Sequence, residues 1–438
     1  MTEPHITNID YPHSNSWDKT KTFVEFDINN HNCALVNSIR RCIIGEVPTL
    51  GFRSVPHEKS TINVIQNDSQ LHNQIISNRL SMLPIYSPNP DKFPVDDFEF
   101  IIDVENNTNF PKDITTNDFK IRIISDNKFL EESKVKEIFP PDPISGNYPL
   151  IIRLKPKHYG YSNLKNADIT TSLKDEFSQE SDNINSNIRF FIKAKAVVSN
   201  GKENGHFSPT AVAAYNNRVD PEKMAQGKLD YVEREKQFHM DHGLTIPDDS
   251  KLESRFMSLE YKRFYYTDDT DEPSKYRFRL ETVGPIPPLV IFYRAIEVLK
   301  DKLDLFRTNL LKSSGEQLDT DPIEVSPSPD LLNAMEILIR DENETLGNLL
   351  QTYMALLFAS YSNPETRKLN YVSYNIPHPL ESAVMLVVQP VEEMEFGKLV
   401  DTIIMPTCAY ISKELDKLQK GLEKTIQYVA EVKSIKGK

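Results

Sequence analysis

Few residues of this sequence have the type and spacing that an active site requires. Its three cysteines, Cys33, Cys42 and Cys408, contain one pair nine residues apart, which forms neither a disulfide framework nor a tetrahedral zinc set. The sequence lacks a Gly-Lys-Ser/Thr phosphate loop, a His-Glu-x-x-His motif and an Asp-rich magnesium triplet. Its acidic residues at 268–272 lie in a polar stretch without an apolar frame. We therefore predict a non-catalytic protein with no cofactor and no bound structural metal.

Two adjacent arginines are the side chains best suited to recognition. Arg40 and Arg41 follow an apolar helical stripe through Leu35 and Ile39, and at about 100° per residue they fall beside it. A guanidinium can bind a carboxylate or a carbonyl through paired hydrogen bonds, which lysine cannot reproduce. We predict that both arginines contact a partner, and a solvated helix face is the alternative.

Three histidines lie beside glycine or proline in expected strands or loops: His57, His206 and His378. Such positions favour structural hydrogen bonding over catalysis or metal binding.

Periodic segments near the start of the chain position these residues. Alternation of apolar and acidic residues over 22–28 predicts a strand, and apolar residues every three to four positions over 33–47 predict an amphipathic helix. Alternation over 52–65 predicts one long strand or two short ones. Much later, 276–280 predicts a strand and 284–311 a helix.

The same order of elements returns after residues 313–330, a stretch rich in Ser, Asp and Pro that we predict to be a linker. There the pattern predicts a strand, a helix, a strand or hairpin, and a long helix with a break at Pro406, over 335–339, 344–360, 372–388 and 392–435. An overlay of the two passages matches Leu35 with Leu346, Asn37 with Asn348, Ile39 with Leu350, and Pro56-His57 with Pro377-His378. The shared order favours duplication over chance.

Composition limits the classes of function. The formal net charge of −13 argues against a protein that holds phosphate backbones through its overall field. The sequence contains neither a spanning apolar run nor a signal peptide, so we expect an intracellular protein. Between the parts of the first copy, the polar segment 58–275 predicts a mostly β insert, with helical composition over 221–265.

Several motifs together resemble the α-type subunit family of multisubunit RNA polymerases. The first helix carries the family's pattern at Leu35, Asn37, Ile39, Arg40, Arg41, Glu46, Val47 and Pro48. The segment 76–85 is similar to a second motif, although Asn78 and Ser81 replace its His and Gly. Residues 194–215 are similar to the insert segment at Gly201, His206, Phe207, Ser208 and Pro209. Residues 340–354 resemble the motif of the family's small partner subunit, as does 377–381.

The resemblance implies an α+β fold with two alpha-like dimerisation domains that form an intrachain pseudo-dimer, plus a mostly β insert domain. We expect the first dimerisation domain at 1–57 and 276–312, the insert at 58–275, the linker at 313–330 and the second dimerisation domain at 331–438. Both partners in one chain resemble the fused subunits of large nucleocytoplasmic DNA viruses. A viral protein of this kind would occupy the host cytoplasm and be packaged in the virion.

The resemblance also implies an assembly platform for a DNA-directed RNA polymerase. Its expected partners are the largest and second-largest subunits and a small zinc-bearing assembly subunit, with little or no DNA contact and no membrane. The implied interface residues are Leu35, Asn37, Ile39, Arg40, Arg41, Glu46, His206, Ser208, Pro209, Leu346, Asn348, Leu350, His378 and Pro379. Among them, Arg40 and Arg41 are expected to face the second-largest subunit. An unrelated two-domain adaptor and an enzyme are the alternatives.

Overall fold

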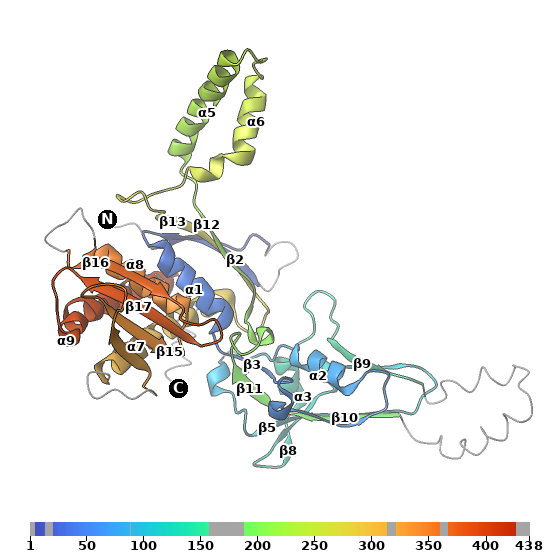
Figure 1. The fold of residues 1–438 in the computed structure, drawn as a ribbon. Coiled ribbons are helices and arrows are strands. Elements are labelled where there is room, and N and C mark those ends of the chain that lie inside the picture. The colour runs from blue at the N-terminus through green and yellow to red at the C-terminus, as the bar shows by residue number, and fades with distance from the viewer. Residues whose placement is uncertain are drawn as a thin grey trace, which may run out of the picture.

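The computed structural model describes residues 5–13, 21–87, 89–156, 188–312, 321–359 and 367–425 (Figure 1). Its first unit is built from two β-hairpins, each followed by a helix. The elements are β1 (Ile6–Asp10), β2 (Phe23–Asn29), α1 (Cys33–Gly45), β12 (Thr210–Asn217), β13 (Lys275–Thr282) and α7 (Pro288–Lys312). The four strands form one antiparallel sheet in the order β1-β2-β13-β12.

The second unit repeats this plan. Its elements are β14 (Ile323–Pro327), β15 (Met335–Arg340), α8 (Glu344–Phe358), β16 (Leu369–Asn375), β17 (Ala383–Pro390) and a long helix made of α9 (Phe396–Leu399), the π-helical turn η8 (Val400–Ile404) and α10 (Met405–Thr425). The sheet order β14-β15-β17-β16 matches that of the first unit, strand for strand. The described part of the chain therefore holds two copies of a ββαββα unit.

The two units share one hydrophobic core. Helices α1 and α7 pack against each other, and each also contacts a helix of the second unit, α8 and α10 respectively. The buried faces belong to both units, as in Leu35 and Ile39 on α1 and Leu346 and Leu350 on α8. Figure 1 shows the helices of the two units gathered side by side. Each sheet buries one face on this helical layer, which explains alternations such as that of β13.

A separate core forms in the insert, which leaves the first unit after α1. Its helices and strands are β3 (Thr49–Phe52), β4 (Ile62–Asn67), α2 (Asn73–Ser81), β5 (Phe98–Asn106), β6 (Lys112–Thr115), β7 (Lys120–Ile123), β8 (Lys128–Phe129), α3 (Glu132–Ile138), β9 (Leu150–Leu154), β10 (Ile188–Ala194) and β11 (Ala196–Ser199). Its main sheet has the order β4-β10-β5-β7-β8, beside the pairs β11-β3 and β6-β9. Phenylalanines such as Phe52, Phe100 and Phe190 fill this core.

A helical hairpin, α5 (Pro221–Asp241) and α6 (Asp249–Leu259), interrupts the first unit between β12 and β13. Figure 1 shows it standing away from the body of the molecule. Its two helices pack through Tyr231, Leu252 and Phe256. Within the part of the chain that the structure describes, no helix is both long and apolar enough to cross a bilayer.

The predicted domain boundaries need three corrections. Strand β3 (Thr49–Phe52) lies inside the predicted first dimerisation domain 1–57, but it pairs with β11 and packs in the insert's core. Strand β12 (Thr210–Asn217) lies inside the predicted insert 58–275 but belongs to the first unit's sheet, so that range is really two excursions. Strand β14 (Ile323–Pro327) lies inside the predicted linker 313–330, because Ile323 is buried against the second unit's core. Residues 313–320 lie outside the described residues.

Two further expectations were wrong. Pro377 and His378 lie in the β16–β17 turn, whose counterpart in the first unit is the β12–β13 excursion, whereas Pro56 and His57 follow β3 of the insert. The two Pro-His pairs are therefore not equivalent. The long C-terminal helix also continues through Pro406, because the wider π-helical turn just before it accommodates the proline ring and its missing N–H. Its predicted end, 426–435, lies outside the described residues.

Candidate functional site: the seam between the two units

The first turn of α8 meets the middle of α1 where the two units join. Each helix starts at an asparagine cap: Asn32 Oδ1 accepts from the Ala34 N–H at 2.8 Å, and Asn343 Oδ1 accepts from the Thr345 N–H at 2.9 Å. Where the two helices approach, the buried Ser38 hydroxyl in the middle of α1 donates to the Ala34 carbonyl at 2.7 Å and lies 3.4 Å from the Thr345 carbonyl at the start of α8. Backbone groups at this close approach are therefore satisfied by short polar side chains.

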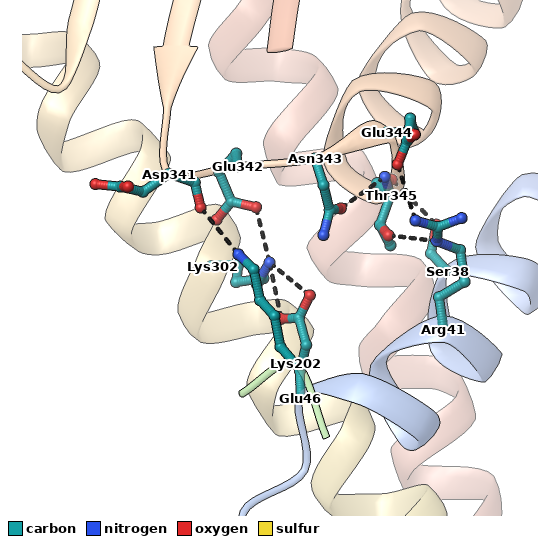
Figure 2. Close-up of polar contacts among 10 residues, drawn as sticks. All are labelled: Ser38, Arg41, Glu46, Lys202, Lys302, Asp341, Glu342, Asn343, Glu344 and Thr345. Atoms are coloured by element: carbon teal, nitrogen blue, oxygen red, sulfur yellow. Dashed lines mark hydrogen bonds and ion pairs between the residues drawn. The ribbon is translucent and has the colours of Figure 1, made fainter. Parts of the chain in front are cut away.

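Arg41 reaches across the seam to the start of α8 (Figure 2). Its Nε donates to Thr345 Oγ1 at 2.8 Å, and one terminal nitrogen donates to Glu344 Oε2 at 2.9 Å. Glu344 also lies in the first turn of α8, where a negative charge interacts favourably with the helix dipole. Because both charged side chains are about 40% exposed, the ion pair contributes roughly 0 to 1 kcal/mol.

Lys302 on α7 lies between two carboxylates from different units (Figure 2). Its Nζ is 2.8 Å from Glu46 Oε2, at the end of α1, and 2.7 Å from Glu342 Oε2, just before α8. All three side chains are largely buried, with exposed fractions of 16%, 10% and 13%. Burial alone would lower the pKa of Lys302, but Glu342 and Glu46 outweigh it and hold that pKa above its ordinary value. The triad therefore links the units through buried charges.

A second charged contact lies at the other end of α1. His31, whose side chain is fully buried, places Nδ1 at an ion-pair distance of 3.2 Å from Glu414 Oε2 on α10. Lys417 donates to the other oxygen of Glu414 at 2.5 Å. Burial would raise the pKa of the Glu414 carboxyl, but His31 and Lys417 outweigh it and lower that pKa to about 2. This contact also joins the first unit to the second.

The predicted interface residues divide into four groups. Those at the seam are Leu35, Ile39, Arg41, Glu46, Leu346 and Leu350, of which the four aliphatic side chains are fully buried. Asn37 and Asn348 stay on their own helices, where they accept hydrogen bonds from Arg40 and Thr352. His206, Ser208 and Pro209 line a cavity of about 40 Å³ at the junction with the insert, while His378 and Pro379 are exposed in the β16–β17 turn.

The prediction for the arginine pair needs a correction for Arg41. It was expected to face another subunit, but its partners Glu344 and Thr345 belong to the same chain. Arg40 is partly exposed, and its Nε donates to Asn37 one turn earlier at 3.0 Å. The two arginines are not equivalent, because Arg41 faces the start of α8 whereas Arg40 bonds back to its own helix.

Sequence reasoning missed the residues that carry the buried charges, which are His31, Lys302, Glu342 and Glu414. Lys302 interrupts the apolar pattern of α7 next to Leu303, and such an interruption is the one available signal. Its partners are 256 and 40 residues away in the sequence, so local periodicity could not identify them.

The fold and this seam define a dimerisation module in which the helices of the two units pack in one common core. The RNA polymerase Rpb3/Rpb11 dimerisation domain family matches residues 25–303, more than half of the chain. The chain therefore belongs to this family of RNA polymerase subunits. The match ends within α7, before the second unit begins.

Individual relatives agree with this family. The chain is 25% identical over 317 residues to the DNA-directed RNA polymerase II subunit RPB3 of Schizosaccharomyces pombe, an alignment that covers 71% of this chain and 92% of that protein. It is 23% identical over 312 residues to the DNA-directed RNA polymerase subunit Rpo3 of Methanobrevibacter smithii, covering 66% and 94%. A shorter alignment to Rpo3 of Pyrococcus horikoshii is 36% identical over 81 residues, covering 18% and 28%.

Proposed function

We propose that this chain is the non-catalytic assembly platform of a multisubunit DNA-directed RNA polymerase, with both partners of the dimerisation module in one polypeptide. The repeated ββαββα unit carries this proposal, because both copies bury their helices in a single core. The family match at residues 25–303 holds most of the first copy and the insert, and polymerase subunits are among the similar proteins. The second copy takes the position of a separate partner subunit, so the two form an intrachain pseudo-dimer.

A covalent link between the partners has a physical consequence. A covalent tether raises the effective concentration of the second unit to the millimolar range and removes a bimolecular step from assembly. The charged contacts of Lys302 and Glu414 then select the correct pairing, because a misaligned pair would leave buried charges without partners.

The platform has separate surfaces for further subunits. We propose that the first unit, including Arg40, binds the second-largest subunit and the small zinc-bearing subunit, and that the second unit binds the largest. In the second unit, the β16–β17 turn exposes His378, Pro379 and Leu380, the last of them 90% exposed. The net charge of −13 fits little or no direct DNA contact.

The fused arrangement also motivates a proposed source. We propose a large nucleocytoplasmic DNA virus, with the protein in the host cytoplasm and in the virion, because both dimerisation units lie in one chain. Proteomic analysis of purified virions tests this, and absence of the chain from them would contradict it.

Affinity purification from its native cells tests the main proposal. A tag on the full chain should recover the two largest polymerase subunits in equal amounts with the chain, as measured by mass spectrometry. A parallel purification of an unrelated protein with the same tag gives the background. Recovery of the folded chain without either large subunit would contradict the proposal.

A further inference from the structure

An open cleft of about 640 Å³ lies at the base of the helical hairpin, where β12 ends and the chain returns from α6. Three tyrosines and three cations dominate its lining: Tyr215, Tyr261, Tyr266, Arg218, Lys262 and Arg277. No aspartate or glutamate is found among the described residues that line it. In a chain with a net charge of −13, such a cleft is a local exception.

The three cations of the cleft differ in how closely they are paired with carboxylates of the chain. Arg277 is already paired with two carboxylates, because its terminal nitrogens lie 3.1 Å from Glu25 Oε2 and 3.2 Å from Asp27 Oδ1. The Arg218 side chain is 47% exposed and approaches Asp27 only to 3.7 Å, beyond the length of a hydrogen bond. Lys262 is exposed and lies 5.8 Å from the centre of the Tyr261 ring. Arg218 and Lys262 can therefore offer donors to an incoming anion.

The aromatic walls are held in place before any ligand arrives. Tyr215 packs on the main core, and its hydroxyl lies 3.2 Å from the Cys33 sulfur. The Tyr266 ring is covered by the Lys275 ammonium at 4.6 Å from its centre. Because these rings need little reordering, a bound side chain can pack on them at a low entropic cost.

The charge distribution decides between two kinds of anionic partner. A nucleic acid needs a row of cations along its phosphates. Here Arg277 is already paired with Glu25 and Asp27, so the described lining offers two cations rather than a row. One or two isolated carboxylates fit better, since Arg218 can bind a carboxylate through two parallel bonds.

We propose that this cleft binds a short peptide segment of a partner protein, one that carries a carboxylate next to an aromatic or apolar side chain. Tyrosine and arginine are the residue types enriched where protein interfaces gain most of their energy. The site lies apart from the seam between the units and does not depend on the proposed role in polymerase assembly.

A peptide display library tests the proposal with the full-length chain. Random 12-residue peptides selected on the wild type should be enriched in Asp and Glu next to aromatic or apolar residues. The affinity of an enriched peptide, measured by fluorescence anisotropy, should fall about tenfold or more in Lys262→Glu and in Arg218→Gln. Gln is chosen at Arg218 because a glutamate there would face the buried Asp27. Circular dichroism checks that both variants are folded.

The control is Lys251→Glu, which makes the same charge change on the exposed part of α6 near the far end of the hairpin. It should leave the peptide affinity within about twofold of the wild type, as a distant surface charge does. Enriched peptides without acidic residues, or an equal loss in the control, would overturn the proposal. A 12-nucleotide single-stranded RNA that binds with the same dependence on Lys262 would replace it with a nucleic-acid site.

Discussion

Among the residues of the seam, Lys302 is the cation whose loss should matter most for folding. Its side chain is less exposed than that of Arg41, and it separates the carboxylates of Glu46 and Glu342. Replacement by methionine keeps the aliphatic stem but leaves two carboxylates facing each other. We expect Lys302→Met to lower the free energy of unfolding by about 2 to 4 kcal/mol, measured by urea denaturation.

A neighbouring lysine provides the matched control. Lys300 also reaches the second unit, where it pairs with Asp416, but that partner is 52% exposed. Lys300→Met should therefore cost less than about 1 kcal/mol. If the two variants lost equal free energy of unfolding, burial of the Lys302 triad would not explain how much that triad stabilises the fold.

The pair of His31 and Glu414 predicts a dependence of stability on pH. The pKa of Glu414 is lowered from 4.5 to about 2 in the folded chain, so the folded state favours the ionised form. The resulting stabilisation is present above the ordinary pKa and is lost as the pH falls from about 4.5 to 2. It amounts to something on the order of 3 kcal/mol.

Replacement of Glu414 by the isosteric glutamine isolates this effect. The wild type should be more stable than Glu414→Gln at pH 6, and the difference should shrink as the pH is lowered below 4, in urea titrations at each pH. Glu392→Gln, at an exposed position, is the control and should not change the profile. A difference that does not depend on pH would contradict the assignment.

The two neighbouring arginines should now behave differently. Among the described residues, Arg40 forms its side-chain hydrogen bond within its own helix and remains available to another subunit, whereas Arg41 bonds across to α8. We expect Arg40→Ala to leave the melting temperature of the isolated chain nearly unchanged and to weaken binding of the second-largest subunit roughly tenfold. Arg41→Ala should instead lower stability slightly, by less than about 1 kcal/mol. The reverse pattern, measured by calorimetry and a pull-down titration, would show that the roles are exchanged.

At the scale of elements, the approach of α8 to its sheet depends on one glycine. A Cβ added at Gly347 would lie 2.6 Å from a methyl of Val384 and 3.1 Å from the Tyr374 ring. Because valine is stiff, the helix would have to move, and Gly347→Ala should cost about 1 to 3 kcal/mol. Gly45, at the end of α1, has open space around it, and its change to alanine should be neutral or slightly stabilising. Thermal unfolding of both variants checks this, and equal melting temperatures would contradict the close packing.

The sequence pattern identified the helices and strands in which apolar residues recur at a regular spacing. The strand predicted at 22–28, the helix at 33–47 and the helix at 344–360 correspond to β2, α1 and α8. The elements that were missed lack such a signal. Strand β14 has only two buried or partly buried apolar residues, Ile323 and Val325, in a Pro-rich stretch, and it is defined by its pairing with β15.

At the seam, too, the sequence predicted only the residues that follow a regular apolar spacing. Apolar residues such as Leu35 and Leu346 could be assigned to it, because a helix that buries one face shows its period in the sequence. The charged pairs could not be assigned from the sequence, because each joins residues that only the packing of the two units brings together. Lys302 and Glu414 look like surface residues until their partners are known.

At the scale of the whole molecule, the two units depend on each other for burial. The core is continuous across α1, α7, α8 and α10, so neither unit alone covers its helical face. The insert has its own core and the hairpin stands apart, which leaves pairing of the units as the step that completes the main core.

This dependence predicts what happens when the chain is divided between the units. Residues 1–312 and 321–438, produced together as two chains, should form a one-to-one complex, because the shared core and the Lys302 triad lie entirely within the two fragments. Since the tether is lost, the melting temperature of the complex should rise with protein concentration, while that of the intact chain should not. Fragment 321–438 alone should aggregate, as Leu346, Leu350 and their neighbours would lose their cover. Sedimentation and thermal scans at several concentrations measure these outcomes, and two fragments that stay soluble and separate would refute the pairing of the units.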